Sequence, residues 1–518
     1  MFLNDVVRLN GRKYPDRPAI VTGDRTITFG ELRDTSWQVA NAMHELGRPG
    51  DRVGILAENL PEYVECYYGV PAAGMALTFL NYRLHPKEWA WILNNAEASV
   101  LLVQAKFLEQ LEPLLAESAP TIEHIIVIDD GTVITNGHPR YRDVVGGAST
   151  DEPPRAIDED ATAWLLYTSG TTGFPKGAML THRNLTVAML ESVIEYEPQP
   201  DEVNLVAFPL CHVAGYSVPV THTRGGCIVL TPMFEPELWM QLVDHHGITG
   251  TALAPTMLNM ILQHPKINDY KLDSLRSIGY GAAAMPVEVL RAAINRFGPI
   301  VYSGFGMTEL GGNVLTFPKS DHERAVNGDE YLLASCGTPM CLADVKVVDE
   351  QMVECPPGVV GEIVIRGEQV LKGYFRNEEG TAKAFHDGWF RTGDMARRDE
   401  EGFFYIVDRM KDMIITGGEN VYSREVEEVL YTHPAVSEAA VVGLPDPKWG
   451  ENVTAVIVLR EGMTATEAEI IATARDRLAG FKKPKRVIFL DELPKTVSGK
   501  IIKRELRDRF TDEATPTI

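Results

Sequence analysis

Short apolar runs alternate with longer amphipathic stretches along most of this 518-residue chain. Residues 100–103 and 163–167 are continuous apolar runs of the kind found in buried strands, whereas residues 28–46 repeat apolar side chains at helical spacing. Thr28 and Glu31 stand three positions apart at the start of that stretch, which fits a helix capping box. Strands that alternate with helices favour layered α/β structure with parallel strands, so we expect an α/β fold.

A second, smaller unit begins near residue 410. Ser423 is placed to cap a helix whose Val426 and Leu430 share one face. Thr464 and Glu467 have capping-box spacing at the start of a second helix. The strands expected in this unit cover residues 439–442, 453–459 and 486–490. The self-contained pattern indicates a separate small α/β domain.

The charge of the chain is uneven. The formal net charge is −23, yet from residue 411 onward 16 Lys and Arg residues stand against 18 Asp and Glu residues, so nearly all the excess acid lies in the larger part. This balance disfavours nucleic-acid and anionic-membrane binding, which require excess Lys and Arg. It leaves room for one anionic ligand held by a few local amides and cations.

No signal peptide is apparent at the charged start of the chain, and no apolar run approaches the ~20 residues of a transmembrane helix. The six cysteines form no C-x-x-C pair, and no His cluster has zinc-ligand spacing. We therefore expect a cytoplasmic protein with reduced cysteines and no integral membrane association, and a homodimer stays open.

A loop rich in glycines and hydroxyl groups follows the apolar residues 164–166. Glycines let backbone amides approach a phosphate closely, hydroxyl groups add donors, and a lysine adds positive charge. The loop is not a Walker A motif, because Lys176 is followed by Gly177 rather than by Ser or Thr. The residues predicted to bind phosphate are Thr168, Ser169, Gly170, Thr171, Thr172, Gly173 and Lys176.

This loop resembles the phosphate loop of the adenylate-forming superfamily, which includes acyl-CoA synthetases, aryl-CoA ligases, luciferases and nonribosomal-peptide adenylation domains. Four further segments resemble the family's other motifs, in the family's order: 304–309, 388–394, 408–412 and 494–500. The chain looks most like a bacterial fatty-acyl-CoA ligase. The resemblance implies a large N-terminal body of layered α/β subdomains, residues 1–410, and a small mobile C-terminal α/β domain, residues 411–518, hinged at Lys411.

The resemblance also implies how ATP is held. Thr308 would donate to the α-phosphate, and Glu309 would bind Mg²⁺, since a hard carboxylate oxygen suits that ion. Asp394 would accept hydrogen bonds from the ribose hydroxyls with Arg409 as a second contact, and Phe305 would stack on adenine, although a core aromatic is its alternative. The other implied nucleotide contacts are Gly281, Ala282, Ala283, Gly306 and Met307.

Lys500 resembles the lysine that bridges the carboxylate and the α-phosphate during adenylation, and a mobile domain is suited to deliver such a point charge. In a second pose, Gly417 and Gly418 would line a tunnel for the pantetheine of coenzyme A, with Asn420 nearby. His212 resembles the gate between ATP and the acid. We expect it to position the substrate, because a carboxylate is already ionised at neutral pH.

The implied reaction joins a carboxylic acid to ATP and then to coenzyme A, with Mg²⁺ as cofactor. The residues that match the family's acyl pocket are His212, Ala214, Val218, Ser277, Tyr280, Gly304, Gly306, Gly312 and Asn313. The glycines are expected to leave room for a chain, and Tyr280 to shorten the pocket or to bond a polar end. A medium- or long-chain fatty acid is the first expectation, and an aryl or steroid side-chain acid the alternative. Amino-acid adenylation and luciferase-type oxidation are less favoured.

Overall fold

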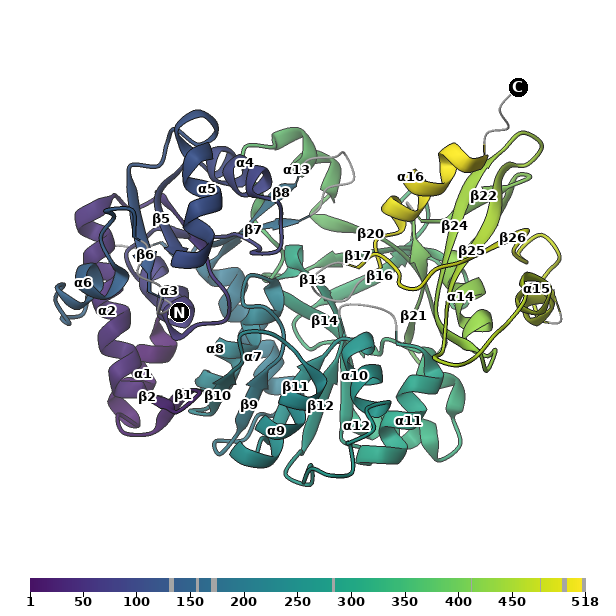
Figure 1. The fold of residues 1–518 in the computed structure, drawn as a ribbon, viewed down its shortest axis with the longest axis horizontal. Helices are drawn as coiled ribbons and strands as arrows, with labels where there is room; N and C mark the ends of the chain where they lie inside the picture. The colour runs from purple at the N-terminus through teal and green to yellow at the C-terminus, as the bar shows by residue number, and fades with distance from the viewer. Residues whose placement is uncertain are drawn as a thin grey trace.

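The computed structural model has the expected α/β architecture, which confirms the predicted fold class. The residues that it describes are 1–129, 135–154, 158–168, 175–281, 285–410, 412–475, 477–495 and 501–514. Within these residues, three sheets and their helices build a large body, and a fourth sheet forms a separate small domain beside it (Figure 1).

The first sheet of the body has seven strands in the described part of the chain, in the order β18-β8-β7-β4-β3-β5-β6. Its strands are β3 (Arg52–Leu56), β4 (Ala76–Phe79), β5 (Ala98–Gln104), β6 (His124–Ile128), β7 (Thr162–Thr168), β8 (Lys176–Thr181) and β18 (Gly373–Tyr374). The helices α2 (Phe29–Leu46), α3 (Pro61–Ala72), α4 (Pro86–Ala96), α5 (Ala105–Ser118) and α6 (Tyr141–Gly146) belong to this region. Strands β3 to β7 are parallel, as expected from their alternation with helices, and β8 returns antiparallel to β7.

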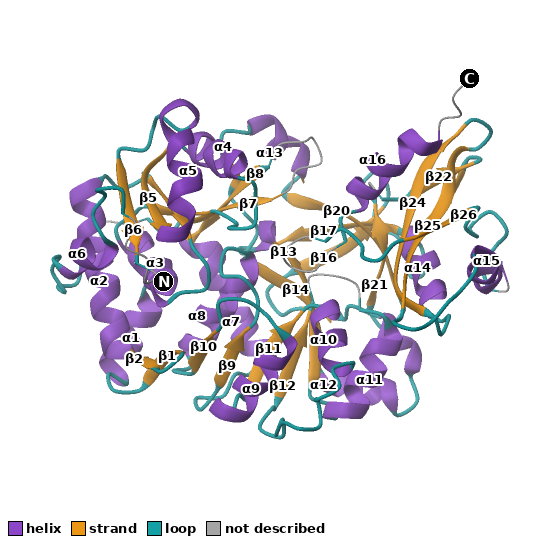
Figure 2. Ribbon diagram, in the orientation of Figure 1, coloured by secondary structure: helices purple, strands orange, loops and turns teal. Residues whose placement is uncertain are grey.

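The second sheet has nine strands among the described residues, in the order β15-β14-β13-β12-β11-β9-β10-β1-β2. Its strands are β1 (Pro18–Thr22), β2 (Arg25–Thr28), β9 (Val203–Val206), β10 (Cys227–Leu230), β11 (Gly250–Leu253), β12 (Ser277–Tyr280), β13 (Val301–Met307), β14 (Gly312–Phe317) and β15 (Thr338–Pro339). Helices α1 (Asp5–Lys13), α7 (His182–Tyr196), α8 (Ser217–Thr223), α9 (Pro236–His246), α10 (Pro255–Leu262), α11 (Val287–Phe297) and α12 (Lys319–Val326) pack along it (Figure 2). The short 3₁₀ helices are η1 (Val213–Tyr216), η2 (Thr308–Leu310) and η3 (Glu330–Ala334).

The third sheet joins the body to the small domain. It contains β16 (Asp344–Val348), β17 (Gly361–Arg366), β19 (Phe385–His386), β20 (Trp389–Arg398) and β21 (Phe404–Arg409), and α13 (Glu378–Ala384) lies beside it. The small domain contains β22 (Ile414–Thr416), β23 (Glu419–Val421), β24 (Val436–Asp446), β25 (Gly450–Leu459), β26 (Arg486–Phe489), α14 (Ser423–Tyr431), α15 (Glu467–Arg475) and α16 (Lys503–Ala514). β21 thus ends in one sheet and β22 begins in another, on either side of Lys411, which lies outside the described residues.

The predicted helix caps are right in the body and wrong in the small domain. Thr28 and Glu31 form both bonds of a capping box, at 3.2 Å and 2.8 Å. Ser423 is the first residue of α14 rather than its cap: its backbone N–H and its hydroxyl both donate to the Asp408 carboxylate from β21. That carboxylate therefore holds the start of the small domain's first helix against the body.

The second predicted cap lies two residues later than expected. Thr466 and Glu469, not Thr464 and Glu467, exchange the capping-box bonds. The Glu467 carboxylate instead accepts the backbone N–H of Val487 in β26, at 2.8 Å. Two overlapping Thr-x-x-Glu spacings compete in this segment, and the contact with β26 selects between them.

Among the described residues, no helix is both long and apolar enough to cross a membrane. The apolar residues instead form the interior, where Val100, Leu101, Leu102 and Val103 have no exposed surface. The small domain has its own apolar cluster, which includes Val426, Leu430 and Ile470. It therefore contains a core separate from that of the body.

Candidate active site

The two ends of the predicted phosphate loop lie opposite each other in a hairpin. Thr168 ends β7 and is the register partner of Lys176, the first residue of β8. The loop between them, with Ser169, Gly170, Thr171, Thr172 and Gly173, lies outside the described residues. The described flanks place a hydroxyl group and an ammonium group at the same end of the first sheet.

The predicted metal ligand lies against this hairpin. Glu309 is buried in η2, which directly follows β13. The hydroxyl groups of Thr168 and Tyr374 both donate to Glu309 Oε1, at 3.4 Å and 3.1 Å. The Lys176 ammonium lies 5.0 Å from the centre of the Tyr374 ring. Residues far apart in sequence therefore converge on one carboxylate beside the phosphate-loop lysine.

Tyr374 was not predicted from the sequence. It reaches the site because β18 pairs with β8, the strand that begins at Lys176. Burial, followed by the charge of Glu309, raises the pKa of the Tyr374 hydroxyl well above its usual range. The hydroxyl is therefore protonated at neutral pH and donates to the carboxylate.

The donor set at Glu309 suits Mg²⁺. The described residues contain no cluster of three or more His, Cys, Asp or Glu side chains that could hold a metal alone. Mg²⁺ commonly binds through one or two carboxylates together with substrate phosphates and water. A single buried carboxylate next to a phosphate-binding hairpin fits that pattern, and the ion would neutralise charge on the phosphates.

The predicted ribose residues form an ion pair. Asp394 in β20 is the register partner of Arg409 in β21, and Arg409 Nε lies 2.9 Å from Asp394 Oδ1. Asp394 is buried, with 4% of its surface exposed, whereas the Arg409 side chain is about a third exposed. Such a pair presents a fixed carboxylate and guanidinium to a ligand with adjacent hydroxyl groups.

The glycines of the second core motif allow two strands to meet closely. A Cβ atom added at Gly306 would lie 2.0 Å from the backbone oxygen of Gly312 in β14, so no larger residue fits. A Cβ atom at Gly281 would lie 3.1 Å from the Gly304 oxygen. Phe305 is half-buried and packs against the core of the body, while Ala282 and Ala283 lie outside the described residues.

Two models of known protein domains match this chain. A model of the AMP-binding enzyme family matches residues 7–375, and a model of the AMP-binding enzyme C-terminal domain matches residues 425–500. The chain belongs to the family of AMP-binding enzymes.

Relatives and solved structures extend the match over the whole chain. A feruloyl-CoA synthase from Amycolatopsis sp is 38% identical over 503 residues, which cover 96% of this chain and 97% of the relative. The medium/long-chain-fatty-acid–CoA ligase FadD8 of Mycobacterium tuberculosis is 36% identical over 521 residues, 97% of this chain and 89% of the relative. The anthranilate CoA ligase AuaEII in complex with anthranoyl-AMP superposes with a TM-score of 0.91 at 27% identity, covering 99% of this chain and 98% of that one.

ATP-bound MatB from Rhodopseudomonas palustris superposes with a TM-score of 0.90 at 31% identity, covering 99% of this chain and 100% of that one. These matches confirm the predicted superfamily and the predicted enzyme class, an AMP-forming carboxylate–CoA ligase with ATP and coenzyme A as co-substrates and Mg²⁺ as cofactor. The roles of individual residues stay predictions, and the structure shows which of them lie together.

The glycines predicted to line the acyl pocket of this AMP-binding enzyme lie close to polar and aromatic side chains. A Cβ atom added at Gly304 would lie 2.1 Å from Asn313 Nδ2 and 2.7 Å from the hydroxyl of Tyr196 in α7. At Gly312 the ring of Tyr216 stands 3.0 Å from such an atom. Neighbouring side chains therefore occupy the positions that a Cβ atom would take at Gly304 and Gly312, and room for a chain at these glycines stays a prediction.

Tyr280 is separated from these residues. It is the register partner of Ser303, so Gly304, the next residue along β13, faces the other side of the sheet. The Tyr280 hydroxyl shares a 2.9 Å hydrogen bond with His322 in α12 and lies in another core cluster. Tyr280 and Gly304 therefore face opposite sides of the sheet, and a role of Tyr280 in shortening the pocket or bonding a polar end stays a prediction.

The remaining predicted pocket residues are spread along the second sheet. His212 directly precedes η1, which contains Ala214, and both residues are half-buried. Val218 has no exposed surface and belongs to the core of the body. Ser277 starts β12, and its hydroxyl lies near Gly250 at the start of β11.

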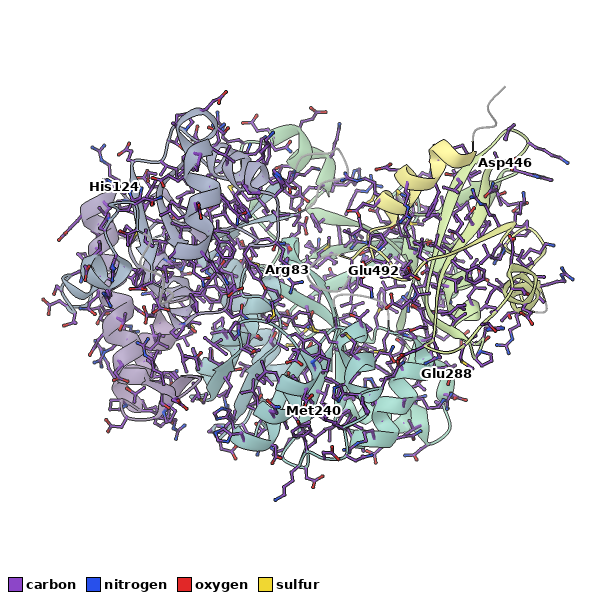
Figure 3. All side chains as sticks on the ribbon, viewed as in Figure 1. Arg83, His124, Met240, Glu288, Asp446 and Glu492 are labelled. Carbon is purple, nitrogen blue, oxygen red and sulfur yellow. The ribbon has the colours of Figure 1, made fainter. Side chains whose placement is uncertain are left out.

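The predicted coenzyme A residues lie in and beside an exposed turn between β22 and β23 of the small domain. Gly417 and Gly418 have φ angles of 63° and 85°, and both glycines and Asn420 are exposed. Gly417 donates to the backbone oxygen of Trp449 at 2.7 Å. Figure 3 places Asp446, which accepts the backbone N–H of Trp449, at the outer edge of this domain, away from the body.

Trp449 was not predicted as part of this turn. A Cβ atom at Gly417 would lie 2.9 Å from its ring, and the Lys485 ammonium lies 4.3 Å from the ring centre. Lys500 lies outside the described residues. Glu492, shortly before it, lies on the side of the small domain nearest the body (Figure 3).

Proposed function

We propose that this AMP-forming carboxylate–CoA ligase activates an aromatic acid that carries a hydrogen-bonding group on its ring. The observation that carries the proposal is the contact of Asn313 and Tyr196 with Gly304, in the region that matches the family's acyl pocket. Tyr302, on the same face of β13 as Gly304, packs against Tyr196 with 4.6 Å between ring centres and an angle of 39° between the ring planes.

The reaction has two steps. The acid's carboxylate attacks the α-phosphorus of ATP and pyrophosphate leaves, which gives an acyl-adenylate. The thiol of coenzyme A then attacks the acyl carbon, AMP leaves, and the thiol proton is released. In the first step we assign metal binding to Glu309, ribose binding to Asp394 and Arg409, and charge bridging to Lys500. His212 orients the carboxylate.

Aromatic side chains dominate the region where the acid would lie. Tyr196, Tyr216 and Tyr302 are each half-buried. Flat faces of this kind pack well against a planar ring. A long alkyl chain needs an apolar channel, and the Asn313 amide and the Tyr196 hydroxyl beside Gly304 favour a polar ring over such a chain.

The hydroxyl and amide groups favour a polar substituent on that ring. Asn313 Nδ2 donates to the Tyr196 hydroxyl at 3.0 Å. Burial raises the pKa of Tyr196 well above its usual range, so the hydroxyl keeps its proton and can donate to a further acceptor. A hydrocarbon tail would desolvate these groups without bonding them, at a cost of about 1–3 kcal/mol for each unsatisfied group.

The relatives support both an aromatic and an aliphatic acid. Feruloyl-CoA synthase and the anthranilate CoA ligase are named for aromatic acids. The 36% identity with a medium/long-chain-fatty-acid–CoA ligase makes a fatty acid the second candidate, and it was the first expectation from the sequence. The polar cluster at Gly304 decides our preference.

The test is a panel of acids assayed for AMP release that depends on coenzyme A. The panel pairs cinnamate with 4-hydroxycinnamate and adds octanoate, palmitate and a steroid side-chain acid. We expect kcat/KM for 4-hydroxycinnamate to exceed that for palmitate by about 100-fold, the scale of one well-formed pocket contact set. A preference for palmitate would overturn the proposal.

Two tyrosine variants assign the preference to the cluster. Tyr196→Phe should lower the ratio of 4-hydroxycinnamate to cinnamate by about 10-fold, because one hydrogen-bonding group is lost. Tyr280→Phe removes a hydroxyl on the opposite face of the sheet and is the matched control, so its ratio should not change. Equal ratios in both variants would exclude Tyr196 from recognition of the ring.

We also propose a cytoplasmic location. All six cysteines are free, which fits a reducing compartment. Cell fractionation tests the location, and sedimentation equilibrium decides whether the homodimer that the sequence left open forms.

A further inference from the structure

A bulge in β20 contains Asp394. Val364 in β17 pairs with Arg391, and Glu362 pairs with Met395, so residues 392–394 stand against the single residue Ile363. Gly393 has a φ angle of 72°, in the left-handed region that favours glycine. Bulges of this kind redirect a side chain out of the regular ladder.

The Glu362 carboxylate fills this bulge. Its Oε1 accepts the backbone N–H of Gly393 at 3.0 Å. Its Oε2 accepts two bonds from the Arg391 guanidinium, at 2.8 Å and 2.6 Å. Glu362 is buried, with 5% of its surface exposed, whereas the Arg391 side chain is 39% exposed, so these charge-assisted bonds join a buried carboxylate to a surface guanidinium.

Thr392 completes the connection between the bulge and Asp394. Its hydroxyl donates to the Ile363 oxygen at 2.8 Å and accepts the backbone N–H of Asp394 at 3.1 Å. The backbone N–H groups of Gly393 and Asp394 therefore both have side-chain acceptors, which are the Glu362 carboxylate and the Thr392 hydroxyl. On the other side, the Asp394 carboxylate meets Arg409 at 2.9 Å.

We propose that Glu362 is a positioning residue for the nucleotide. It holds the bulge so that the Asp394 carboxylate faces the ribose, and it does so without touching ATP. The inference rests on the proposed role of Asp394 in binding ribose. It assigns Glu362, which belongs to none of the predicted motifs, to the same site by its contacts alone.

A merely structural role for Glu362 makes a different prediction from a positioning role. If Glu362 only stabilised the sheet, its loss would lower activity with every nucleotide alike. If it aims Asp394, its loss should remove the advantage that a ribose hydroxyl provides. The ratio of kcat/KM for ATP to that for 2′-deoxy-ATP separates the two, because a reduced fraction of folded enzyme cancels in the ratio.

The experiment measures this ratio by pyrophosphate release in the full-length enzyme and in four variants. Glu362→Ala removes every bond to the bulge, and Glu362→Gln keeps an acceptor for Gly393 while losing the charge opposite Arg391. Glu354→Ala is the matched control, since Glu354 pairs with Arg398 at the surface of the same sheet region, at 3.3 Å. Asp394→Asn is the reference for a damaged ribose site.

We expect Glu362→Ala to lower the ratio by about 10-fold and to raise KM for ATP while KM for the acid stays within about 2-fold, as for a misplaced binding group. The ratio for Glu362→Gln should lie between those of Glu362→Ala and the natural enzyme. The ratio for Glu354→Ala should equal that of the natural enzyme. An unchanged ratio in both Glu362 variants overturns the inference. If Asp394→Asn lowers the ratio in that case, only Glu362 has been misassigned. If Asp394→Asn leaves it unchanged as well, the ribose assignment has failed too.

Discussion

The region proposed to bind the nucleotide and the region proposed to bind the acid differ in how their residues contact each other. On the nucleotide side, residues from separate motifs contact each other: Thr168 bonds Glu309, and Arg409 pairs with Asp394. On the acid side, the motif supplies glycines, and the space beside them is filled by Asn313 and Tyr196. If the proposed roles hold, the motifs bind ATP and the residues packed against them select the acid.

The largest expected effect lies on the nucleotide side. Glu309→Gln keeps the shape of the side chain and removes its charge, so the Mg²⁺ site loses its carboxylate. We expect ATP–pyrophosphate exchange to fall by about 1,000-fold, the scale of a lost electrostatic contact in the transition state. Glu354→Gln, at the surface, is the control, and a rate for Glu309→Gln within a few-fold of natural would contradict the assignment.

A change on the acid side should separate the two regions. In Gly304→Ala the new methyl group would lie 2.1 Å from Asn313 Nδ2, so Asn313 must move. We expect kcat/KM for the preferred acid to fall by about 100-fold, while KM for ATP stays within about 2-fold. Gly146→Ala is the matched control, since nothing lies within 4 Å of its added Cβ. Equal losses for acid and ATP would mean that the two sides are not separable at β13.

A change in the small domain should affect the second step alone. Trp449→Ala removes the ring beside Gly417 and loosens the exposed glycine turn. We expect conversion of preformed acyl-adenylate to the thioester to slow by about 10-fold, with pyrophosphate exchange unchanged. Phe481→Ala, at a 39% exposed aromatic of the same domain, is the control. Loss of exchange in Trp449→Ala would place the turn in the first step instead.

The smallest effect concerns stability in the body, away from both regions. Glu65 accepts the Tyr141 hydroxyl at 2.9 Å, and burial raises its pKa to about 7. Below the unfolded pKa of about 4.3 both states are protonated; above it the unfolded state ionises first, so stability falls as the pH rises toward 7. Glu65→Gln should therefore gain a few degrees in Tm relative to the natural enzyme between pH 5 and pH 8. A constant difference across that range would contradict the shift.

The sequence was sufficient for features that are local or repeated within the family. The capping box at Thr28 and the parallel strands follow from spacing, and the meeting of Asp394 with Arg409 follows from two motifs on neighbouring strands. Tyr374 and Tyr196 could not be found in this way. They reach Glu309 and Asn313 across 65 and 117 residues, and only the pairing of β18 with β8 and the contact of α7 with β14 bring them there.

The cap at the start of α15 shows the same limit at shorter range. Thr464 with Glu467 and Thr466 with Glu469 satisfy the same local rule, so the sequence offers two helix starts of equal quality. The Glu467 carboxylate bonds the backbone N–H of Val487, so the helix starts with the cap formed by Thr466 and Glu469. Tertiary contacts thus decide what local chemistry leaves undetermined.

Two adjacent residues at the end of β21 contact different parts of the molecule. Arg409 at its end belongs to the ribose pair, and Asp408 beside it holds the first turn of α14 through Ser423. The small domain cannot leave its present position without giving up that carboxylate, one residue from the guanidinium that pairs with Asp394. The binding of ATP and the docking of the small domain use neighbouring residues of β21, so any coupling between the two events must be reciprocal. If bound ATP favours the docked position of the small domain by a given factor, the docked domain must raise the affinity for ATP by the same factor.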